Sequence, residues 1–182
     1  MTRVETVKLV ASILTPVLVA GLGYLISRTL RRLEDTAWTG RKFVEKRLAL
    51  YEEMAPMLND LYCFFDCVGN FRSITPPDAI NLKRELDKRF HVNKFLFSPD
   101  FRHRYDALME SCYQTWSGLG QNAKLRTSPV RQQAERGEAW SRDWEECFSH
   151  LEMATDDADK EELYTKLMKA FAAELGYAGE NA

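Results

Sequence analysis

The chain has 182 residues, a formal net charge of −2 at pH 7 and an apolar residue fraction of 45%. This charge balance excludes a general electrostatic attraction to nucleic acid or acidic lipid, although basic residues are concentrated locally. The length suffices for a domain that buries its own core.

The first predicted element is a membrane-spanning helix. Residues Leu9 to Ser27 carry no charged side chain. A helix rises about 1.5 Å per residue and the hydrocarbon core is about 30 Å thick, so about 20 apolar residues cross it. The run, extended to Val7, meets that length. A cleaved signal peptide is one alternative. It is disfavoured because the third residue before the candidate cleavage point after Ala20 is the bulky Leu18, where signal peptides have a small residue. A buried core helix is another, although core helices seldom stay uncharged for so long.

Basic residues are concentrated on the C-terminal side of this run. They are Arg28, Arg31, Arg32, Arg41, Lys42, Lys46 and Arg47. The other flank carries only Arg3 and Lys8. Because an excess of Lys and Arg marks the cytoplasmic side, we expect the N-terminus outside and the C-terminal part in the cytoplasm. The predicted segments are an inner-membrane anchor over 1–27, a basic juxtamembrane segment over 28–40 and a cytoplasmic helical domain over 41–182.

Small and polar residues of the predicted anchor gather on one side of the helix. At about 100° per residue, this side carries Ser12, Thr15, Pro16, Val19, Gly23 and Ser27. Helices in lipid associate through small residues and hydroxyl hydrogen bonds, since lipid supplies no hydrophobic drive between them. We expect this oligomer face to contact copies of the same chain, or to line a small pore. The alternative is a chance arrangement in which the hydroxyls bond their own backbone.

The remainder of the chain is predicted to be all-α, with no strands, and to form a bundle of about five helices. Apolar residues recur there at three- and four-residue spacings. The expected helices cover 41–71, 75–91, 98–116, 137–153 and 155–175. Thr75 and Ser98 each precede proline and are good N-caps. Residues 117–136 have weak periodicity, and we expect them to form the longest loop.

The sequence contains no motif that indicates an enzyme. It lacks a Gly-Lys-Ser/Thr phosphate-binding loop, a His-Glu-x-x-His pair and a Gly-x-Ser-x-Gly elbow. The cysteines at 63, 67, 112 and 147 show no metal-ligand spacing with the scattered histidines, so we expect reduced, buried side chains. We therefore expect neither catalysis nor a cofactor.

Two groups of basic residues are candidates for binding an anion. One is the basic loop over 117–136, close in sequence to an aromatic residue, and the other lies on the polar face of the helix over 75–91. The candidate ligand-binding residues are Lys124, Arg126, Arg131, Trp116, Lys83 and Arg84. Cations that follow phosphates and aromatics that stack on bases are typical of single-stranded nucleic-acid binding. The alternative is ordinary surface charge, with Trp116 in the core.

Three stretches that follow the single short anchor are similar in sequence to a known group of proteins. They are EKRLALYEEMAPMLNDLYCFF, INLKRELDKRF and YDALMESCYQTW. The chain resembles the small membrane effectors of bacterial anti-phage systems, in particular the membrane effectors of the Hailong system. That resemblance implies a homo-oligomeric membrane channel, held closed by oligodeoxyadenylate from a partner nucleotidyltransferase and opened when the oligomer is lost during infection. It carries over no binding residues, because it rests on no diagnostic motif.

We therefore expect a homo-oligomeric effector that forms a ligand-regulated pore or lesion in the inner membrane. The cytoplasmic helices would sense an anionic nucleotide or oligonucleotide. The alternative is a membrane-tethered adaptor that recruits a cytoplasmic partner without forming a pore.

Overall fold

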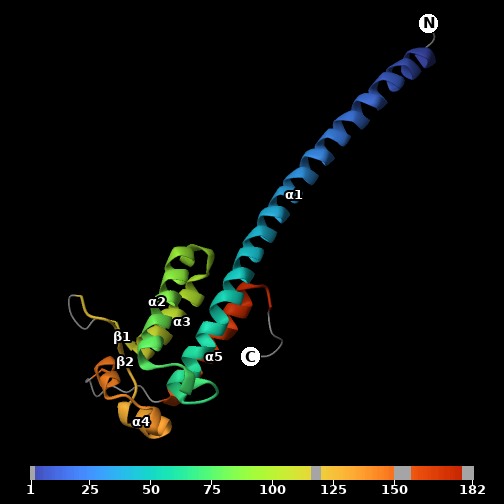
Figure 1. Ribbon diagram of the computed structural model, residues 1–182. Helices are drawn as coiled ribbons and strands as arrows, with labels where there is room; N and C mark the ends of the chain where they lie inside the picture. Colours follow the sequence, from blue (N-terminus) through green and yellow to red (C-terminus); the bar gives the residue numbers. More distant parts are fainter. Residues whose placement is uncertain (1–2, 116–119, 150–156, 178–182) are drawn as a thin grey trace. The chain divides into compact units, whose positions relative to one another are not determined.

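The computed structural model describes residues 3–115, 120–149 and 157–177 (Figure 1). Within these ranges it leaves undescribed the side chains of 3–21, 23, 25, 31–37, 39, 157 and 158. Most of the described residues are helical, which confirms the predicted all-α class. The chain forms two compact units, Met1–Phe43 and Val44–Ala182.

Helix α1, Arg3–Asp66, contributes to both units and includes the segment predicted as the membrane anchor. No helix among the described residues combines the length and the apolarity needed to cross a membrane. Five residues of the predicted oligomer face lie in the part of α1 of which only the backbone is described. They are Ser12, Thr15, Pro16, Val19 and Gly23. The sixth, Ser27, is described and exposed.

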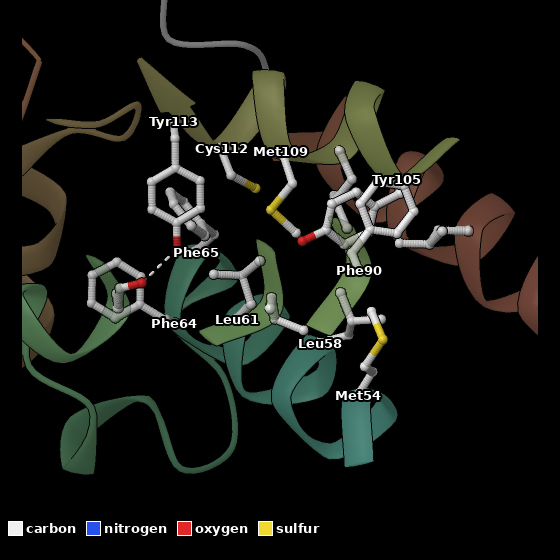
Figure 2. Close-up of a cluster of buried hydrophobic side chains, with 14 of the residues drawn as sticks. Met54, Leu58, Leu61, Phe64, Phe65, Phe90, Tyr105, Met109, Cys112 and Tyr113 are labelled. Atoms are coloured by element: carbon white, nitrogen blue, oxygen red, sulfur yellow. Dashed lines mark hydrogen bonds between the residues drawn. The ribbon is translucent and has the colours of Figure 1, made fainter. Parts of the chain in front are cut away.

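The second unit packs the end of α1 with helices α2 (Pro76–Asn93), α3 (Pro99–Cys112) and α5 (Asp157–Glu174), and α3 packs most extensively against α5. Its core is rich in aromatic rings (Figure 2). Phe90 stacks on Tyr105 with ring centroids 3.9 Å apart, and Phe101 lies 4.6 Å from Phe171. Each fully buried Leu or Phe contributes about 1.5–3 kcal/mol, so this core accounts for much of the unit's stability.

A half-buried ion pair joins three of these helices. The Arg47 guanidinium lies 3.1 Å from the Glu174 carboxylate and also donates to the Leu96 carbonyl at 2.6 Å. The same carboxylate accepts from the Ser98 backbone N–H at 2.7 Å. Arg47, which the sequence suggested as one of the basic flanking residues, therefore connects α1, α5 and the start of α3.

The predicted helix starts at Thr75 and Ser98 are confirmed. The Asp78 N–H donates to the Thr75 hydroxyl at 3.3 Å, and the Thr75 N–H donates to the Asp78 carboxylate at 3.0 Å. The Phe101 N–H donates to the Ser98 hydroxyl at 3.2 Å. These contacts satisfy N–H groups that the first turn of a helix leaves without intrahelical partners.

The predicted absence of strands is wrong in one place. β1 (Tyr113–Gln114) pairs antiparallel with β2 (Lys124–Leu125), with Tyr113 opposite Leu125. The third predicted helix consequently ends at Cys112, because Tyr113 adopts extended dihedrals of φ −135° and ψ 140°. Two-residue strands are too short to produce an alternating pattern that a sequence would reveal.

Two further predicted boundaries are wrong. The predicted loop over 117–136 contains helix α4 (Pro129–Arg136), whose buried residues are the polar Gln132 and Arg136, so it has no apolar stripe to detect. The described part of the predicted helix over 137–153, residues 137–149, contains two short 3₁₀ segments instead, η3 (Gly137–Ala139) and η4 (Arg142–Cys147), and 150–153 lie outside the described residues. The spacing of Trp140 and Trp144 suggested an α-helix. The two rings instead pack edge to face, with their centroids 5.6 Å apart, at the start of the 3₁₀ segment η4.

Candidate functional site

The cations of the predicted basic loop contact the backbone of the same chain. The Lys124 ammonium donates to the Glu146 carbonyl, and the Arg126 guanidinium donates to the Glu110 carbonyl at 3.0 Å. Trp116 lies outside the described residues. Lys124 and Arg126 are half-buried and lie on or beside β2. Their contacts connect this strand to η4 and to the end of α3.

Helix α4 presents a row of polar side chains to the C-terminal end of α1. The Arg131 guanidinium donates to the Asp66 carbonyl at 2.9 Å, and the Gln132 amide donates to the Phe64 carbonyl at 2.8 Å. Both carbonyls belong to the last turn of α1, which has no intrahelical donors for them. Cys67, at φ 58°, turns the chain away immediately afterwards. The predicted ligand residue Arg131 therefore caps a helix.

Arg136 is the most enclosed cation of this row, with only 6% of its surface exposed. Its guanidinium donates to the carbonyls of Phe71 at 2.9 Å and Ile74 at 2.8 Å, and to the side-chain oxygen of Gln132 at 3.1 Å. It lies 5.3–5.7 Å from the rings of Phe71, Phe64 and Trp144. Burial is the main reason that its pKa is lowered from the ordinary value of an arginine. We call Arg131, Gln132 and Arg136 the α4 clamp.

The second predicted basic patch is divided by the fold. Lys83 is buried, forms an ion pair with Asp87 and lies 5.6 Å from the Tyr113 ring. Arg84, its neighbour, is exposed and donates to the side-chain oxygen of Asn122. The two cations therefore do not form one surface, and Lys83 belongs to the packing of α2 against β1.

A different group of basic residues lines an open hollow between the end of α2 and the start of α3. The hollow has a volume of about 330 Å³. Its lining residues are Phe90, His91, Lys94, Pro99, Arg102, His103 and Asp106. We call this feature the α2–α3 hollow. The sequence shows its two histidines as scattered, and only the packing of α2 against α3 brings them to one site.

A second cavity, between α1, α3 and α5, is too small for a ligand. Its volume is about 10 Å³, which corresponds to about one water molecule. Cys112 lines it, and burial raises the pKa of this thiol from 9.0 to about 12. A protonated, buried thiol is a poor nucleophile and a poor metal ligand. Among the described residues, no group of three or more His, Cys, Asp and Glu side chains could hold a metal ion.

Comparisons with protein-family models, curated proteins and solved structures give no match for this chain.

Proposed function

We propose that the chain is an inner-membrane protein whose N-terminal helix crosses the bilayer and whose second unit lies in the cytoplasm. The observation that carries this proposal is the charge-free run from Leu9 to Ser27, followed at once by Arg28, Arg31 and Arg32. Such a run matches the hydrocarbon thickness, and the arginines match the rule for cytoplasmic flanks.

We further propose that copies associate through the small and polar face of this helix and that the assembly forms a pore or lesion, as an anti-phage effector would. The support is the gathering of Ser12, Gly23 and similar residues on one side of a helix. α1 also remains helical as far as Asp66, within the second unit. The connection between the proposed anchor and the regulatory domain is therefore helix rather than loop.

One observation favours a second candidate function, the membrane-tethered adaptor. The cations expected to hold an anionic nucleotide donate to backbone carbonyls within the chain, as Lys124, Arg126 and Arg131 all do. An adaptor needs no ligand at these residues. A nucleotide-regulated pore, with a nucleotidyltransferase as partner, would need another site or a rearranged loop.

Membrane topology is the first test. The full chain with a C-terminal tag should stay in the membrane fraction after alkaline carbonate extraction. The tag should be protected when protease is added to the periplasmic side. Extraction into the soluble fraction would refute the anchor, and cleavage of the tag would reverse the orientation.

Expression without any partner separates the pore from the adaptor. A pore should depolarise the inner membrane, measured with a potential-sensitive dye, and arrest growth. Gly23→Leu should weaken this effect by holding helices apart, at a cost of about 1–2 kcal/mol of interhelical contact. Leu25→Ala, on the other side of the helix, is the matched control. A harmless wild type would support the adaptor, and equal effects of the two substitutions would show that the proposed face is accidental.

A further inference from the structure

The α2–α3 hollow holds basic side chains that the fold leaves without anionic partners. Lys94 and Arg102 form no ion pair within the described chain. The Lys94 ammonium lies 5.2 Å from the Phe95 ring, and the Arg102 guanidinium makes one long contact of 3.4 Å with the Ser98 carbonyl. Asp106 is the one carboxylate in the lining. The hollow therefore differs from the α4 clamp, where the Arg136 guanidinium donates hydrogen bonds to several backbone carbonyls.

Two exposed apolar residues follow lining residues of the hollow in the sequence, and the ring of one of them, Phe95, lies 5.2 Å from the Lys94 ammonium. Phe95 is 82% exposed and Val92 is 76% exposed, the two highest values among large apolar side chains on the described residues. Val92 lies in the last turn of α2, directly after the lining residue His91. Phe95 lies in η2 (Lys94–Leu96), directly after the lining residue Lys94. Single exposed apolar residues are common, but here the two most exposed ones lie three residues apart on the segment that also supplies His91 and Lys94 to the hollow.

We infer that this corner is a docking surface for an anionic membrane. The hollow takes the phosphate-bearing headgroup of an anionic phospholipid, and Phe95 and Val92 enter the boundary between headgroups and acyl chains. Anionic leaflets attract Lys and Arg near their surface, and aromatic and aliphatic side chains at the same surface gain by leaving water. A soluble phosphate would use the cations but would leave Phe95 in water, so the pairing of the two features favours lipid.

This inference goes beyond the proposed anchor, because it concerns the second unit and holds whether or not the N-terminal helix crosses the bilayer. It gives the unit a contact with the membrane that depends on lipid charge. Because the attraction is electrostatic, it should weaken as salt rises and the screening length shortens.

The test measures amide hydrogen exchange in peptides that cover 90–103. The full chain is placed in nanodiscs of phosphatidylcholine alone or of equal parts phosphatidylcholine and phosphatidylglycerol. Exchange should be slower with the anionic lipid. Lys94→Glu combined with Arg102→Glu should remove the difference, because each basic residue near such a surface contributes about fivefold in affinity. Val92→Ser combined with Phe95→Ser should remove it as well.

Matched controls change the same number of charges or apolar groups elsewhere. Lys88→Glu with Lys169→Glu alters two exposed lysines outside the hollow, and the difference in exchange should persist. Val130→Ser with Tyr177→Ser removes two apolar side chains that are each 73% exposed, again without effect. Circular dichroism of every variant confirms that the helices are intact.

Three results would overturn the inference. Equal exchange in the two lipid compositions would show that lipid charge is irrelevant. Slower exchange with inorganic phosphate in detergent, unaffected by the Val92 and Phe95 substitutions, would assign the hollow to a soluble anion. Slower exchange that grows with protein concentration would assign the surface to a second copy of the chain. Failure of the proposed anchor would be seen separately, because carbonate would then extract the chain from the membrane fraction. In that case exchange in the same peptides is measured with the chain added to preformed vesicles of the two lipid compositions.

Discussion

Replacing Arg136 tests whether the α4 clamp holds the second unit together. The Arg136 guanidinium is nearly enclosed, yet no carboxylate pairs with it among the described residues. Its partners are the carbonyls of Phe71, Arg72 and Ile74 and the side-chain oxygen of Gln132. Arg136→Met keeps much of the side-chain volume and removes every donor.

The expected loss of unfolding free energy follows from these partners. Each buried acceptor left without a donor costs about 1–3 kcal/mol. Arg136→Met removes the side-chain donor from the carbonyls of Arg72 and Ile74 and from the Gln132 side-chain oxygen, whereas the Phe71 carbonyl keeps the Ile74 N–H. Methionine also avoids desolvating a charge, which recovers several kcal/mol that the buried guanidinium costs the native protein. The net loss should be about 2–4 kcal/mol. Arg136→Lys should lose nearly as much, because one ammonium lacks the planar fork that reaches acceptors on opposite sides.

Urea unfolding of the full chain in detergent, followed by circular dichroism, measures this loss. Arg142→Met is the matched control, because Arg142 is exposed, has no partner among the described residues and belongs to the adjoining η4. Its free energy of unfolding should change by no more than about 0.5 kcal/mol. If Arg136→Met and Arg142→Met were equally stable, or if Arg136→Lys behaved as the wild type, the clamp would not have the role assigned to it.

Three further predictions concern buried acids and a helix cap. Burial is the main cause that raises the pKa of Tyr105 and Tyr113 above 10.0. The unfolded chain releases these protons first, so stability should be complete below about pH 10 and fall above it by about 1.4 kcal/mol per pH unit for each phenol. Tyr105→Phe should reduce that slope in urea titrations between about pH 10 and 11.5, whereas an unchanged slope would contradict the assignment. With its thiol pKa raised to about 12, Cys112 should react with iodoacetamide at about pH 8 about a thousandfold more slowly in the native protein than in urea, by mass spectrometry. Comparable rates would show that the site opens readily. Thr75→Ala should lower the free energy of unfolding by about 1 kcal/mol, because it removes the side-chain cap on α2. Ser73→Ala, at a nearby exposed residue, is the matched comparison and should change it less.

The main helices were predictable because their signals are local. Thr75 and Ser98 each place a side-chain oxygen before proline, and both caps form as expected. The apolar spacing that ends near Phe65 gave the last part of α1, since every third or fourth residue there packs into one core. These features need only neighbours along the chain, so a single sequence contains them.

The elements around β1 and β2 were not predictable, because their causes are distant in the sequence. Helix α4 is held by Gln132 and Arg136, whose partners lie more than sixty residues away at Phe64 and Phe71. A polar helix of this kind has no apolar period to detect. Its one local signal was Ser128 before proline, the same pattern as Ser98, and the structure does show the cap at 3.3 Å.

The ligand residues illustrate why charge in a sequence is ambiguous. An arginine that caps a helix and an arginine that binds an anionic ligand are the same residue type in the sequence. They differ only in the groups that surround them in the fold. Arg131 and Arg136 each donate to a carbonyl at 2.9 Å, so an added phosphate would have to compete with contacts of the fold. Lys94 and Arg102 line an open hollow and lack such close acceptors. The cations with the fewest close acceptors therefore lie at the junction of α2 and α3 rather than in the basic loop, on a segment that also carries Val92 and Phe95, the most exposed large apolar side chains of the described residues.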